Sequence, residues 1–366
     1  MTYNLTLRNY IHDRISEVRE EFSWGNFDII NYHGFIMDQY RKVGGDLDKH
    51  GGDFEKLFSD EQLFDAFEDK IRKYETILID EIQDFEVPWI KIMRKYFLAE
   101  GGEMVLFGDE SQNIYNRPLA LLNHQLRGFG DWEALTVSYR SSSGSPLTRL
   151  ISDFQSTFLL SKHDTDLIEG HDASNKQMSL EIQENDILEY AHLGNSSTWS
   201  NLAENIYGFM RTHNIQPNDM CIVGGEIAPL RQLEKAYKAR TGEETNTTFE
   251  TQEVYEMVLS EIDSNRLPTD FRKKEIEEKL EPIRRSKKFH FWQNRGTLKL
   301  STIHSYKGLE AENIVFLLGG NDTDEIVYTA ITRSKTNLLA YFPPGHKYAG
   351  FFEQRLQSLS WTKRLS

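Results

Sequence analysis

The sequence has little of three features that mark particular classes of protein: cysteine, long apolar runs and positive charge. Its 366 residues include one cysteine, Cys221, which cannot form an internal disulfide and therefore indicates a reducing compartment. The apolar neighbours of Cys221 suggest a core thiol rather than a nucleophile. No apolar run is long enough to span a membrane, and the first residues do not form a targeting signal. We therefore expect a cytoplasmic protein with no membrane partner.

Positive charge is scarce, with 42 basic and 57 acidic side chains and a net charge of −15. This argues against a protein that coats nucleic acid by bulk attraction, although a local groove could still grip one strand. The clearest basic stretch, residues 284–299, contains six lysines and arginines, no acid and three interleaved aromatic residues. That pattern fits single-strand binding by phosphate neutralisation and base stacking. It also fits a solvated helix end followed by a half-buried strand, the interpretation we favour.

Short continuous apolar runs alternate with polar loops and helical patterns. The runs lie at residues 76–79, 104–107, 220–223, 298–301 and 314–318. Continuous apolar runs are typical of strands buried on both faces, as in parallel sheets covered by helices. We therefore predict an α/β fold of βαβ units, with ligand-binding polar clusters beyond the carboxyl ends of the strands. The chain is long enough for two domains, and the Ser/Gly-rich residues 137–145 suggest the boundary.

The first chemical motif follows the first of these runs, in Ile77-Leu-Ile-Asp80-Glu81-Ile-Gln83-Asp84. A buried strand that ends in Asp-Glu has the Walker B arrangement. Asp80 could hold Mg²⁺ through its waters, and Glu81 could take a proton from an attacking water. An apolar strand followed by two acids is common, so the motif alone would more often be a solvated strand end. Gln83 and Asp84 make it more specific.

Three further motifs follow in order. In Gly108-Asp-Glu-Ser-Gln112-Asn-Ile-Tyr115, the amide of Gln112 could contact a γ-phosphate. The second is Thr302-Ile-His304-Ser-Tyr-Lys-Gly308-Leu-Glu310, where His304 alone would more often be a hydrogen-bonded loop residue. The third is Val327-Tyr-Thr-Ala-Ile-Thr-Arg333-Ser-Lys335. An arginine on a helix there could stabilise phosphoryl-transfer charge, although in isolation Arg333 would more often be a surface residue.

In type, order and spacing, these segments resemble the motifs of the UvrD/Rep branch of superfamily 1 DNA helicases, over nearly the whole chain. The segments resemble helicase motifs as follows: residues 2–4 motif Ia, 31–33 motif Ib, 80–84 motif II, 108–115 motif III, 138–142 motif IV, 302–310 motif V and 327–335 motif VI. The resemblance implies two RecA-like domains of the P-loop NTPase fold. Residues 1–137 would form an incomplete first domain and residues 138–366 the second, with a short helical insertion at about 250–290.

The resemblance also implies an activity and the residues that carry it. The chain would take part in ATP-dependent, 3′ to 5′ helicase or translocase activity on single-stranded or partly duplex DNA, with ATP and Mg²⁺ as cofactors and DNA repair among the pathways served. The implied roles are Mg²⁺ binding by Asp80; water activation by Glu81; γ-phosphate contact by Gln112, Arg140 and Arg333; nucleotide binding by Gly308 and Glu310; and contact with the DNA strand by Tyr3, Asn4, His33, Tyr115, Thr302 and His304.

One departure from the family is decisive for the chemistry. The sequence contains no Gly-Lys pair and hence no Gly-x-x-x-x-Gly-Lys-Ser/Thr loop to cradle phosphates. Each lost charge-assisted contact is worth about 1.5–3 kcal/mol, so ATP turnover by this chain alone should be poor. We expect the loop to lie upstream of Met1 or on a P-loop-containing partner chain. A single-strand-binding module that has lost catalysis is the alternative.

Two smaller departures concern DNA. After Tyr115 the chain reads Asn116-Arg117-Pro118-Leu119 where the family often has an aromatic residue, so Arg117 would have to stack on a base instead. The interval from His33 to Asp80 is short, and the interval from Arg140 to Thr302 must also hold part of the second domain. The inserted subdomains of the family should therefore be nearly absent, which predicts weak strand separation.

Overall fold

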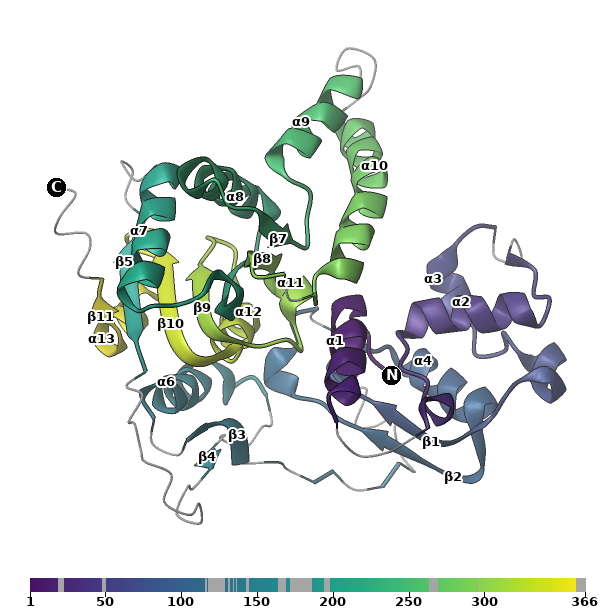
Figure 1. The fold of residues 1–366 in the computed structure, drawn as a ribbon. Helices are drawn as coiled ribbons and strands as arrows, with labels where there is room; N and C mark the ends of the chain where they lie inside the picture. Colours follow the sequence, from purple (N-terminus) through teal and green to yellow (C-terminus); the bar gives the residue numbers. More distant parts are fainter. Residues whose placement is uncertain are drawn as a thin grey trace. The chain divides into compact units, whose positions relative to one another are not determined.

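The structure is a computed structural model. It describes residues 1–18, 23–47, 51–115, 117, 129–130, 132–133, 135, 137–142, 145–163, 169–171, 186–193, 198–262, 269–293 and 295–359, with the backbone alone at 13, 137–142, 169–171 and 269–271. The chain divides into two compact units (Figure 1). Unit 1 comprises Met1–Ala134 with His163–Thr165, and unit 2 comprises Leu135–Lys162 with Asp166–Ser366.

Unit 1 is built around a short parallel sheet. Its elements are α1 (Leu5–Ser16), η1 (Trp24–Asn26), α2 (Tyr32–Lys42), α3 (Phe54–Phe58), η3 (Asp65–Lys70), β1 (Tyr74–Ile79), η4 (Ile82–Asp84), α4 (Val87–Ile92), η5 (Met93–Phe97), β2 (Leu98–Leu106) and η6 (Glu110–Gln112). Strand β1 pairs with β2 in parallel, with Ile77 opposite Met104 and Ile79 opposite Leu106. These four side chains join one hydrophobic core with residues of α2 and α4.

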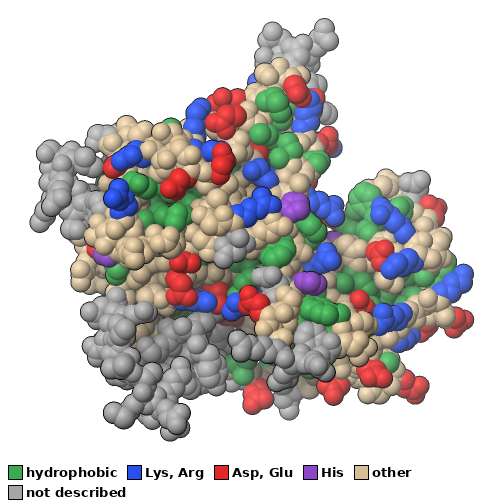
Figure 2. Space-filling model, in the orientation of Figure 1, with side chains coloured by type: hydrophobic (Ala, Val, Ile, Leu, Met, Phe, Trp, Pro, Cys, Tyr) green, Lys and Arg blue, Asp and Glu red, His purple; other side chains and the backbone are tan. Residues whose placement is uncertain are grey.

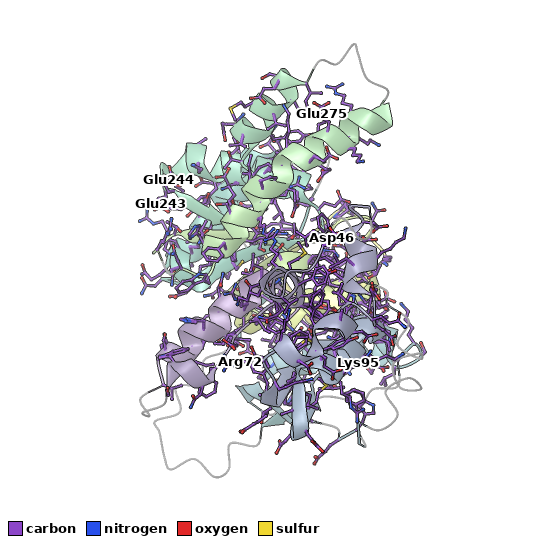
Figure 3. All side chains as sticks on the ribbon, turned by 90° about the vertical axis from the view of Figure 1, so that its right-hand side faces the viewer. Asp46, Arg72, Lys95, Glu243, Glu244 and Glu275 are labelled. Carbon is purple, nitrogen blue, oxygen red and sulfur yellow. The ribbon has the colours of Figure 1, made fainter. Side chains whose placement is uncertain are left out.

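The two faces of this small sheet differ, which corrects the prediction that such strands are buried on both. Ile77 and Ile79 are buried, whereas Leu78, Val105 and Phe107 are 50%, 37% and 42% exposed. Polar side chains on the rest of the unit, such as Arg72 and Lys95, point outward (Figure 3). In the part of the chain that the structure describes, one apolar face of the sheet in unit 1 is therefore partly exposed.

Unit 2 contains a seven-stranded sheet. Its elements are β3 (Val137–Ser142), α6 (Pro146–Phe154), η7 (Gln155–Leu159), β4 (Glu169–His171), β5 (Leu188–His192), α7 (Trp199–Thr212), η9 (Pro217–Asp219), β6 (Met220–Gly224), α8 (Ile227–Thr241), β7 (Thr245–Thr247), α9 (Gln252–Glu261), α10 (Thr269–His290), β8 (Leu298–Thr302), α11 (Ile303–Tyr306), β9 (Ala311–Leu317), α12 (Asp324–Ile331), β10 (Ser334–Phe342), α13 (Ala349–Arg355) and β11 (Gln357–Ser358). The strand order is β11-β5-β10-β9-β6-β8-β7.

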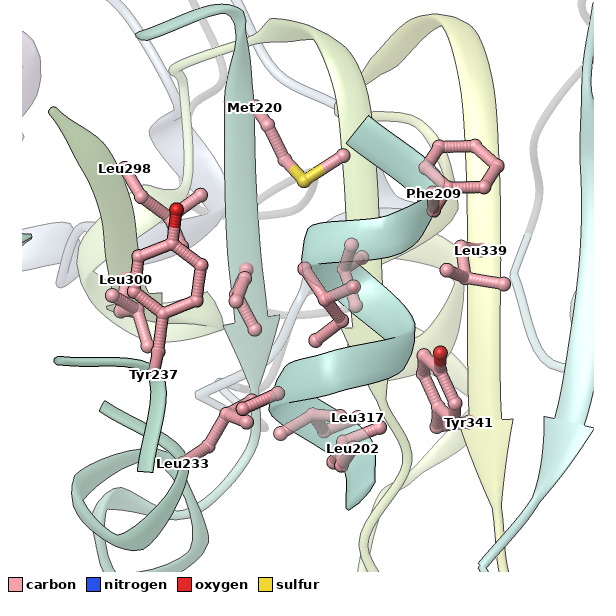
Figure 4. Packing of buried hydrophobic residues seen from close by; sticks show 14 of the residues in the cluster. Leu202, Phe209, Met220, Leu233, Tyr237, Leu298, Leu300, Leu317, Leu339 and Tyr341 are labelled. Atoms are coloured by element: carbon pink, nitrogen blue, oxygen red, sulfur yellow. The ribbon is translucent and has the colours of Figure 1, made fainter. Parts of the chain in front are cut away.

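Helices cover both faces of this sheet. Apolar residues of α7 and α8, among them Phe209 and Leu233, pack on strand residues such as Leu317 and Leu339 (Figure 4). Helix α7 starts where the Thr198 hydroxyl accepts the N–H of Asn201, and α8 ends at Gly242, whose φ of 71° is the left-handed cap that glycine adopts readily. On the other face, the ring of Phe342 lies 5.8 Å from that of Phe352 in α13.

The predicted α/β class with parallel sheets is confirmed, because every strand pairing among the described residues is parallel. All five predicted apolar runs lie in or overlap strands, but β4, β5, β7, β10 and β11 were not predicted. The interval predicted as a helical insertion holds α9 and α10, which project from the sheet of unit 2 (Figure 1). Within the described part of the chain, no helix is both long and apolar enough to cross a membrane.

Candidate functional site

The loop after β1 presents the two acids of the Asp-Glu motif. Glu81 has φ 56° and ψ 50°, a left-handed conformation that only one other non-glycine residue adopts among the described residues. Such a conformation costs about 1–3 kcal/mol and persists where the surrounding structure enforces it. Asp80 Oδ1 accepts the N–H of Glu81 at 3.0 Å, which tightens the reversal of the chain. The two carboxylates therefore lie immediately beyond the carboxyl end of β1, as the sequence predicts.

Gln83 joins this loop to the loop that follows β2. Its Nε2 donates to Glu81 Oε2 at 2.6 Å, and its Oε1 accepts the N–H of Asp109 at 3.1 Å. Gln83 is 1% exposed. In the sequence, Gln83 made the Asp-Glu motif more specific, but no role could be predicted for it. The structure shows that it holds the Glu81 carboxylate in place and fixes the spacing of the two loops.

Gln112 lies in the second of these loops. Asp109 Oδ1 accepts the N–H of Ser111, and its Oδ2 accepts from Gln112 Nε2 at 2.7 Å. A Cβ atom at Gly108 would lie 2.5 Å from Ile82 Cγ2, so the close approach of the loops requires glycine there. Gln112 is thus bonded to Asp109, which Gln83 links to Glu81. To act as a phosphate contact, its amide would have to exchange this bond for one to the nucleotide.

The oxygen ligands at this edge fit a magnesium ion that is bound together with a nucleotide. Among the described residues, no group of three or more histidine, cysteine or carboxylate side chains could hold a metal by itself. Mg²⁺ commonly uses one or two carboxylates, several waters and substrate phosphates rather than a protein cage. Asp80, with Glu81 beside it, provides that smaller set. The two carboxylates are therefore compatible with a Mg²⁺–nucleotide complex.

Three of the residues predicted to contact a DNA strand form one aromatic cluster in unit 1. The ring of Tyr3 lies 5.6 Å from that of His33 and 5.3 Å from that of Tyr115. Trp89, which the sequence reasoning did not consider, stacks on Tyr3 at 6.0 Å. The guanidinium carbon of Arg117 lies 4.8 Å from the centre of the Trp89 ring. Trp89 follows Pro88 at the start of α4, and nothing local in the sequence indicates its partners.

Burial keeps the polar members of the cluster neutral. Burial, together with a smaller effect of the nearby Arg117 and against an opposing effect of Glu86, lowers the pKa of His33 to about 4. Burial likewise raises the pKa of Tyr115. Arg117, paired with Glu86 at 2.7 Å, is therefore the cation of the cluster. Asn116, Pro118 and Leu119, the neighbours of Arg117 in the sequence, lie outside the described residues.

Asn4 has a local role in the structure. Its Oδ1 accepts the N–H of Thr6 at 2.9 Å at the start of α1, as a helix-capping residue does. Thr302 in unit 2 acts similarly, accepting the N–H of Ser305 at the start of α11. His304 follows at the carboxyl end of β8, where burial lowers its pKa, with smaller contributions from Lys307 and Lys288. Contact of these three residues with DNA stays a prediction.

Glu310 and Arg333 are not beyond the carboxyl ends of strands, which corrects the expectation for these two motifs. Glu310 precedes β9 and Arg333 precedes β10, so both lie at the amino ends of neighbouring strands. Gly308, with φ 81°, and the one-turn helix α11 carry the chain from one end of the sheet to the other. Lys335 Nζ lies 2.7 Å from Glu310 Oε1.

Arg333 is 2% exposed and follows α12 rather than lying within it. Its guanidinium donates to the carbonyls of Thr329 and Leu309 and to the Thr332 hydroxyl. A role toward phosphate would therefore require this side chain to leave its own loop, and that role stays a prediction. For Arg140 the structure describes the backbone in β3 alone, so its predicted role lies outside the described side chains.

Two other interpretations can be assessed in unit 2. Cys221 is buried, and burial raises the pKa of its thiol to about 12, which agrees with a core thiol. In the basic stretch, Arg284 donates to Glu250 and Glu277, and Lys287 donates to the hydroxyl of Thr247. These two cations are bound within the unit, which agrees with the structural interpretation of that stretch. Acidic and basic side chains are interspersed on the visible surface (Figure 2).

Sequence reasoning also missed a polar cluster at the carboxyl ends of β6 and β9. The Asp322 carboxylate accepts the N–H of Gly319 at 2.8 Å, and a Cβ atom at Gly225 would lie 2.1 Å from Asp322 Oδ1. Burial raises the pKa of Asp322 to about 6. The contact explains why the loop after β6 has glycine at this position.

The chain resembles solved helicase structures only distantly. One is the C-terminal domain of a possible DNA helicase from Lactobacillus plantarum WCFS1, with a TM-score of 0.32 and 14% identity over 60% of this chain and 98% of that one. Another is the Arterivirus helicase, nonstructural protein 10, with a TM-score of 0.35 and 12% identity over 78% of this chain and 43% of that one. No family model and no curated protein matches the sequence. Likenesses this weak carry no argument about function.

Proposed function

We propose that the chain is the motor part of an ATP-dependent DNA helicase or translocase of the UvrD/Rep type, which becomes active when a phosphate-binding loop is supplied. The observation that supports this most directly is the hydrogen-bonded unit of Glu81, Gln83 and Asp109. It brings the acids after β1 and the polar loop after β2 together at the carboxyl ends of adjacent parallel strands, where α/β sheets bind ligands.

In this proposal each residue has a defined task. Asp80 holds Mg²⁺, which would neutralise the developing charge on the phosphates. The Glu81 carboxylate, oriented by the amide of Gln83, accepts the proton of the attacking water. Gln112 exchanges its bond to Asp109 for one to the γ-phosphate, so that the loop after β2 responds to the nucleotide.

The aromatic cluster would bind the DNA strand. Tyr3, His33 and Tyr115 offer ring faces, and Arg117 offers a cation close to Trp89. Stacking of bases on such side chains is worth about 1–3 kcal/mol per base and depends little on sequence. Tyr115 directly follows the Gln112 loop, so a change at the nucleotide could pass to the strand along a short segment. Movement 3′ to 5′ is part of the proposal by resemblance.

DNA-stimulated ATP hydrolysis tests the catalytic part. A chain extended at its N-terminus by an apolar strand, a Gly-x-x-x-x-Gly-Lys-Thr loop and a helix should hydrolyse ATP. Glu81→Gln in that chain should lower the rate by about 100-fold or more, the usual contribution of a general base. Glu55→Gln, which changes an exposed glutamate of the same unit, should leave the rate unchanged. An extended, folded chain that hydrolyses no ATP would overturn the proposal.

A second candidate is a single-strand-binding module without catalysis, because the sequence has no Gly-Lys pair while the aromatic cluster is assembled. Both candidates predict that Arg117→Ala weakens binding of a fluorescent single-stranded oligonucleotide, by roughly 5- to 10-fold. Arg72→Ala is the matched control, because Arg72 also lies over a tyrosine ring. ATP distinguishes the two candidates. It should change the affinity of the extended chain for the oligonucleotide only if the chain is a motor.

A further inference from the structure

The structure divides the cations of the basic stretch between two faces of α10. On the inner face, Arg284 Nε donates to the buried Glu250 at 2.6 Å, and Lys287 Nζ donates to the Thr247 hydroxyl in β7 at 2.9 Å. Residues three apart in a helix lie on one side of it, so these two cations share the face that packs on unit 2. The structural interpretation of the basic stretch applies to this face.

The carboxyl end of α10 is also anchored, which fixes the direction of its outer face. Phe291 is 1% exposed, and its ring lies 6.2 Å from that of Tyr306 in α11. Asn246 Nδ2 donates to the Phe291 carbonyl at 3.0 Å. Helix α10 therefore ends beside α11, which begins at the carboxyl end of β8 and contains His304 (Figure 1).

The outer face of α10, which we define as Arg285, Lys288 and Phe289, carries two cations and an aromatic ring. Positions three and four residues apart place these side chains on one side of the last two turns. Arg285 is exposed, Lys288 is half-buried and Phe289 is 45% exposed. The exposed Glu278 and Glu281 lie on the preceding turns of the same side, so the basic surface is confined to the end of the helix.

The outer face lies close to His304. The charge of Lys288 helps to lower the pKa of His304, after the larger effects of burial and of Lys307. Basic and histidine side chains lie together over the end of α10 (Figure 2). His304 is one of the residues predicted to contact DNA, so the outer face would continue that surface from the carboxyl end of β8 onto α10.

The chemistry of the outer face selects among occupants. Cations at the carboxyl end of a helix stabilise its dipole, and a single exposed phenylalanine is common. Neither effect explains an exposed ring that lies with two cations beside His304. An acidic protein surface would pair with the cations but has no use for the ring, and a duplex keeps the faces of its bases stacked inside. A single strand offers both phosphates and base faces.

We propose that the outer face of α10 binds single-stranded DNA beside His304, with Arg285 and Lys288 on successive phosphates and Phe289 stacked on a base. This rests on the proposed function and adds to it a DNA contact from the α9–α10 segment. That segment lies outside every motif in which the chain resembles a helicase. The glutamates of the preceding turns limit the contact to about one or two nucleotides.

The salt dependence of DNA binding by the full chain tests the two cations. The probe is a fluorescent oligothymidylate of about 16 nucleotides, followed by anisotropy. Arg285→Gln/Lys288→Gln should weaken binding by about 10- to 25-fold at about 0.1 M salt, and should reduce the slope of log affinity against log salt by about 1.4, or about 0.7 per phosphate. Lys273→Gln/Lys274→Gln removes the same charge from exposed positions near the other end of α10 and should change neither quantity.

Two measurements test the ring and the location. Phe289→Ala should weaken binding by about fivefold or more without changing the salt slope, because it removes a stacking contact and no charge. Met257→Ala, at a 53% exposed position of α9, should have no effect. In the unaltered chain, an oligonucleotide that carries 5-iodouracil should cross-link under ultraviolet light to the peptide that contains Phe289. The conservative Arg285→Lys/Lys288→Arg should retain binding.

Four results would refute the DNA contact. They are unchanged affinity in Arg285→Gln/Lys288→Gln, an equal loss in Lys273→Gln/Lys274→Gln, equally tight binding of a duplex together with no effect of Phe289→Ala, and self-association in sedimentation that Arg285→Gln/Lys288→Gln abolishes. The last result would assign the outer face to an acidic surface of a second copy of the chain.

This contact and the motor proposal fail separately. If Arg117→Ala weakens binding and the extended chain hydrolyses ATP while Arg285→Gln/Lys288→Gln binds normally, the outer face of α10 is not a DNA contact and the motor proposal stands. If Arg285→Gln/Lys288→Gln loses binding as expected while the extended chain hydrolyses no ATP, the contact stands and the motor proposal is wrong.

Discussion

At the scale of single residues, Glu81 and Gln83 carry the local constraint of the site. Glu81 has a left-handed backbone conformation. The side chain of Gln83 forms hydrogen bonds with both the Glu81 carboxylate and the N–H of Asp109. A strained backbone is retained when neighbouring bonds enforce it, so the buried amide of Gln83 stabilises the geometry that the acids need. Stability and catalysis should therefore both depend on this glutamine.

Replacing Gln83 by leucine tests this dependence. The change removes the hydrogen bonds that Gln83 makes to the Asp109 N–H and the Glu81 carboxylate, and we expect the free energy of unfolding to fall by about 1–3 kcal/mol. Gln62→Leu, on an exposed turn of the same unit, should change it by no more than about 0.5 kcal/mol. Urea unfolding followed by tryptophan fluorescence measures both. Equal stability of the two variants would show that the bridge is dispensable.

The aromatic cluster predicts a pH dependence. The pKa of His33 is about 4 in the folded chain and about 6.5 when unfolded, so between these pH values the unfolded chain binds more protons. The free energy of unfolding should therefore be highest above pH 6.5 and fall as the pH drops from 6.5 toward 4. His33→Gln should flatten this dependence and the exposed His12→Gln should not, as measured by urea unfolding at several pH values. A steep dependence that persists in His33→Gln would contradict the assignment.

At the scale of elements, the two helices that project from unit 2 are attached by a buried ion network. Glu250, which is 0% exposed, accepts from Arg231 Nη1 in α8 and from Arg284 Nε in α10, both at 2.6 Å. The guanidinium of Arg231 also lies over the ring of Tyr255 in α9. Pairing with two cations offsets the cost of burying the carboxylate. The network therefore fixes where α9 and α10 leave the sheet.

Removing one of the two arginines should lower the stability of unit 2, because the buried Glu250 carboxylate then has one cation fewer to offset its charge. Arg284→Met should lower the free energy of unfolding of unit 2 by about 3–5 kcal/mol. Arg285→Met, at the exposed neighbouring position, should change it by about 0.5 kcal/mol or less. Thermal unfolding of both variants provides the comparison. If Arg284→Met lost single-strand binding at unchanged stability, the basic stretch would be a nucleic-acid site instead.

At the scale of the whole molecule, each of the two units has its own hydrophobic core, and the largest sheet of unit 2 has more strands than the sheet of unit 1. The core of unit 1 includes Ile36 and that of unit 2 includes Ile222, and neither core contains residues of the other unit. Seven strands covered on both faces stabilise unit 2, whereas the described part of unit 1 has two strands and a sheet with one partly exposed face. Small sheets need additional strands or helices for independent stability. We therefore expect unit 1 to open more readily.

Hydrogen exchange read by mass spectrometry tests this difference. In the unaltered chain, the amides of β1 and β2 should exchange faster than those of β6 and β9. Ile222→Ala should cost unit 2 about 2–5 kcal/mol and accelerate exchange in β6, β8 and β9 without affecting β1 and β2. Ile36→Ala should accelerate exchange in β1 and β2 without affecting β6, β8 and β9. Acceleration of both sheets by either variant would mean that the units unfold as one.

The sequence by itself determined the α/β class, five of the strands and the position of Asp80 and Glu81 at a strand end, because hydrophobic runs and their termini are local properties. The absence of a Gly-Lys pair is also a property of the sequence alone and does not depend on the fold. Only the tertiary structure decided the partners: Gln83 with Asp109, Arg284 with Glu250, and Tyr3 with Trp89. It also placed Glu310 and Arg333 at the amino ends of their strands and, among the described residues, left one face of β1 and β2 partly exposed. Such pairings depend on how distant segments pack, which local patterns do not encode.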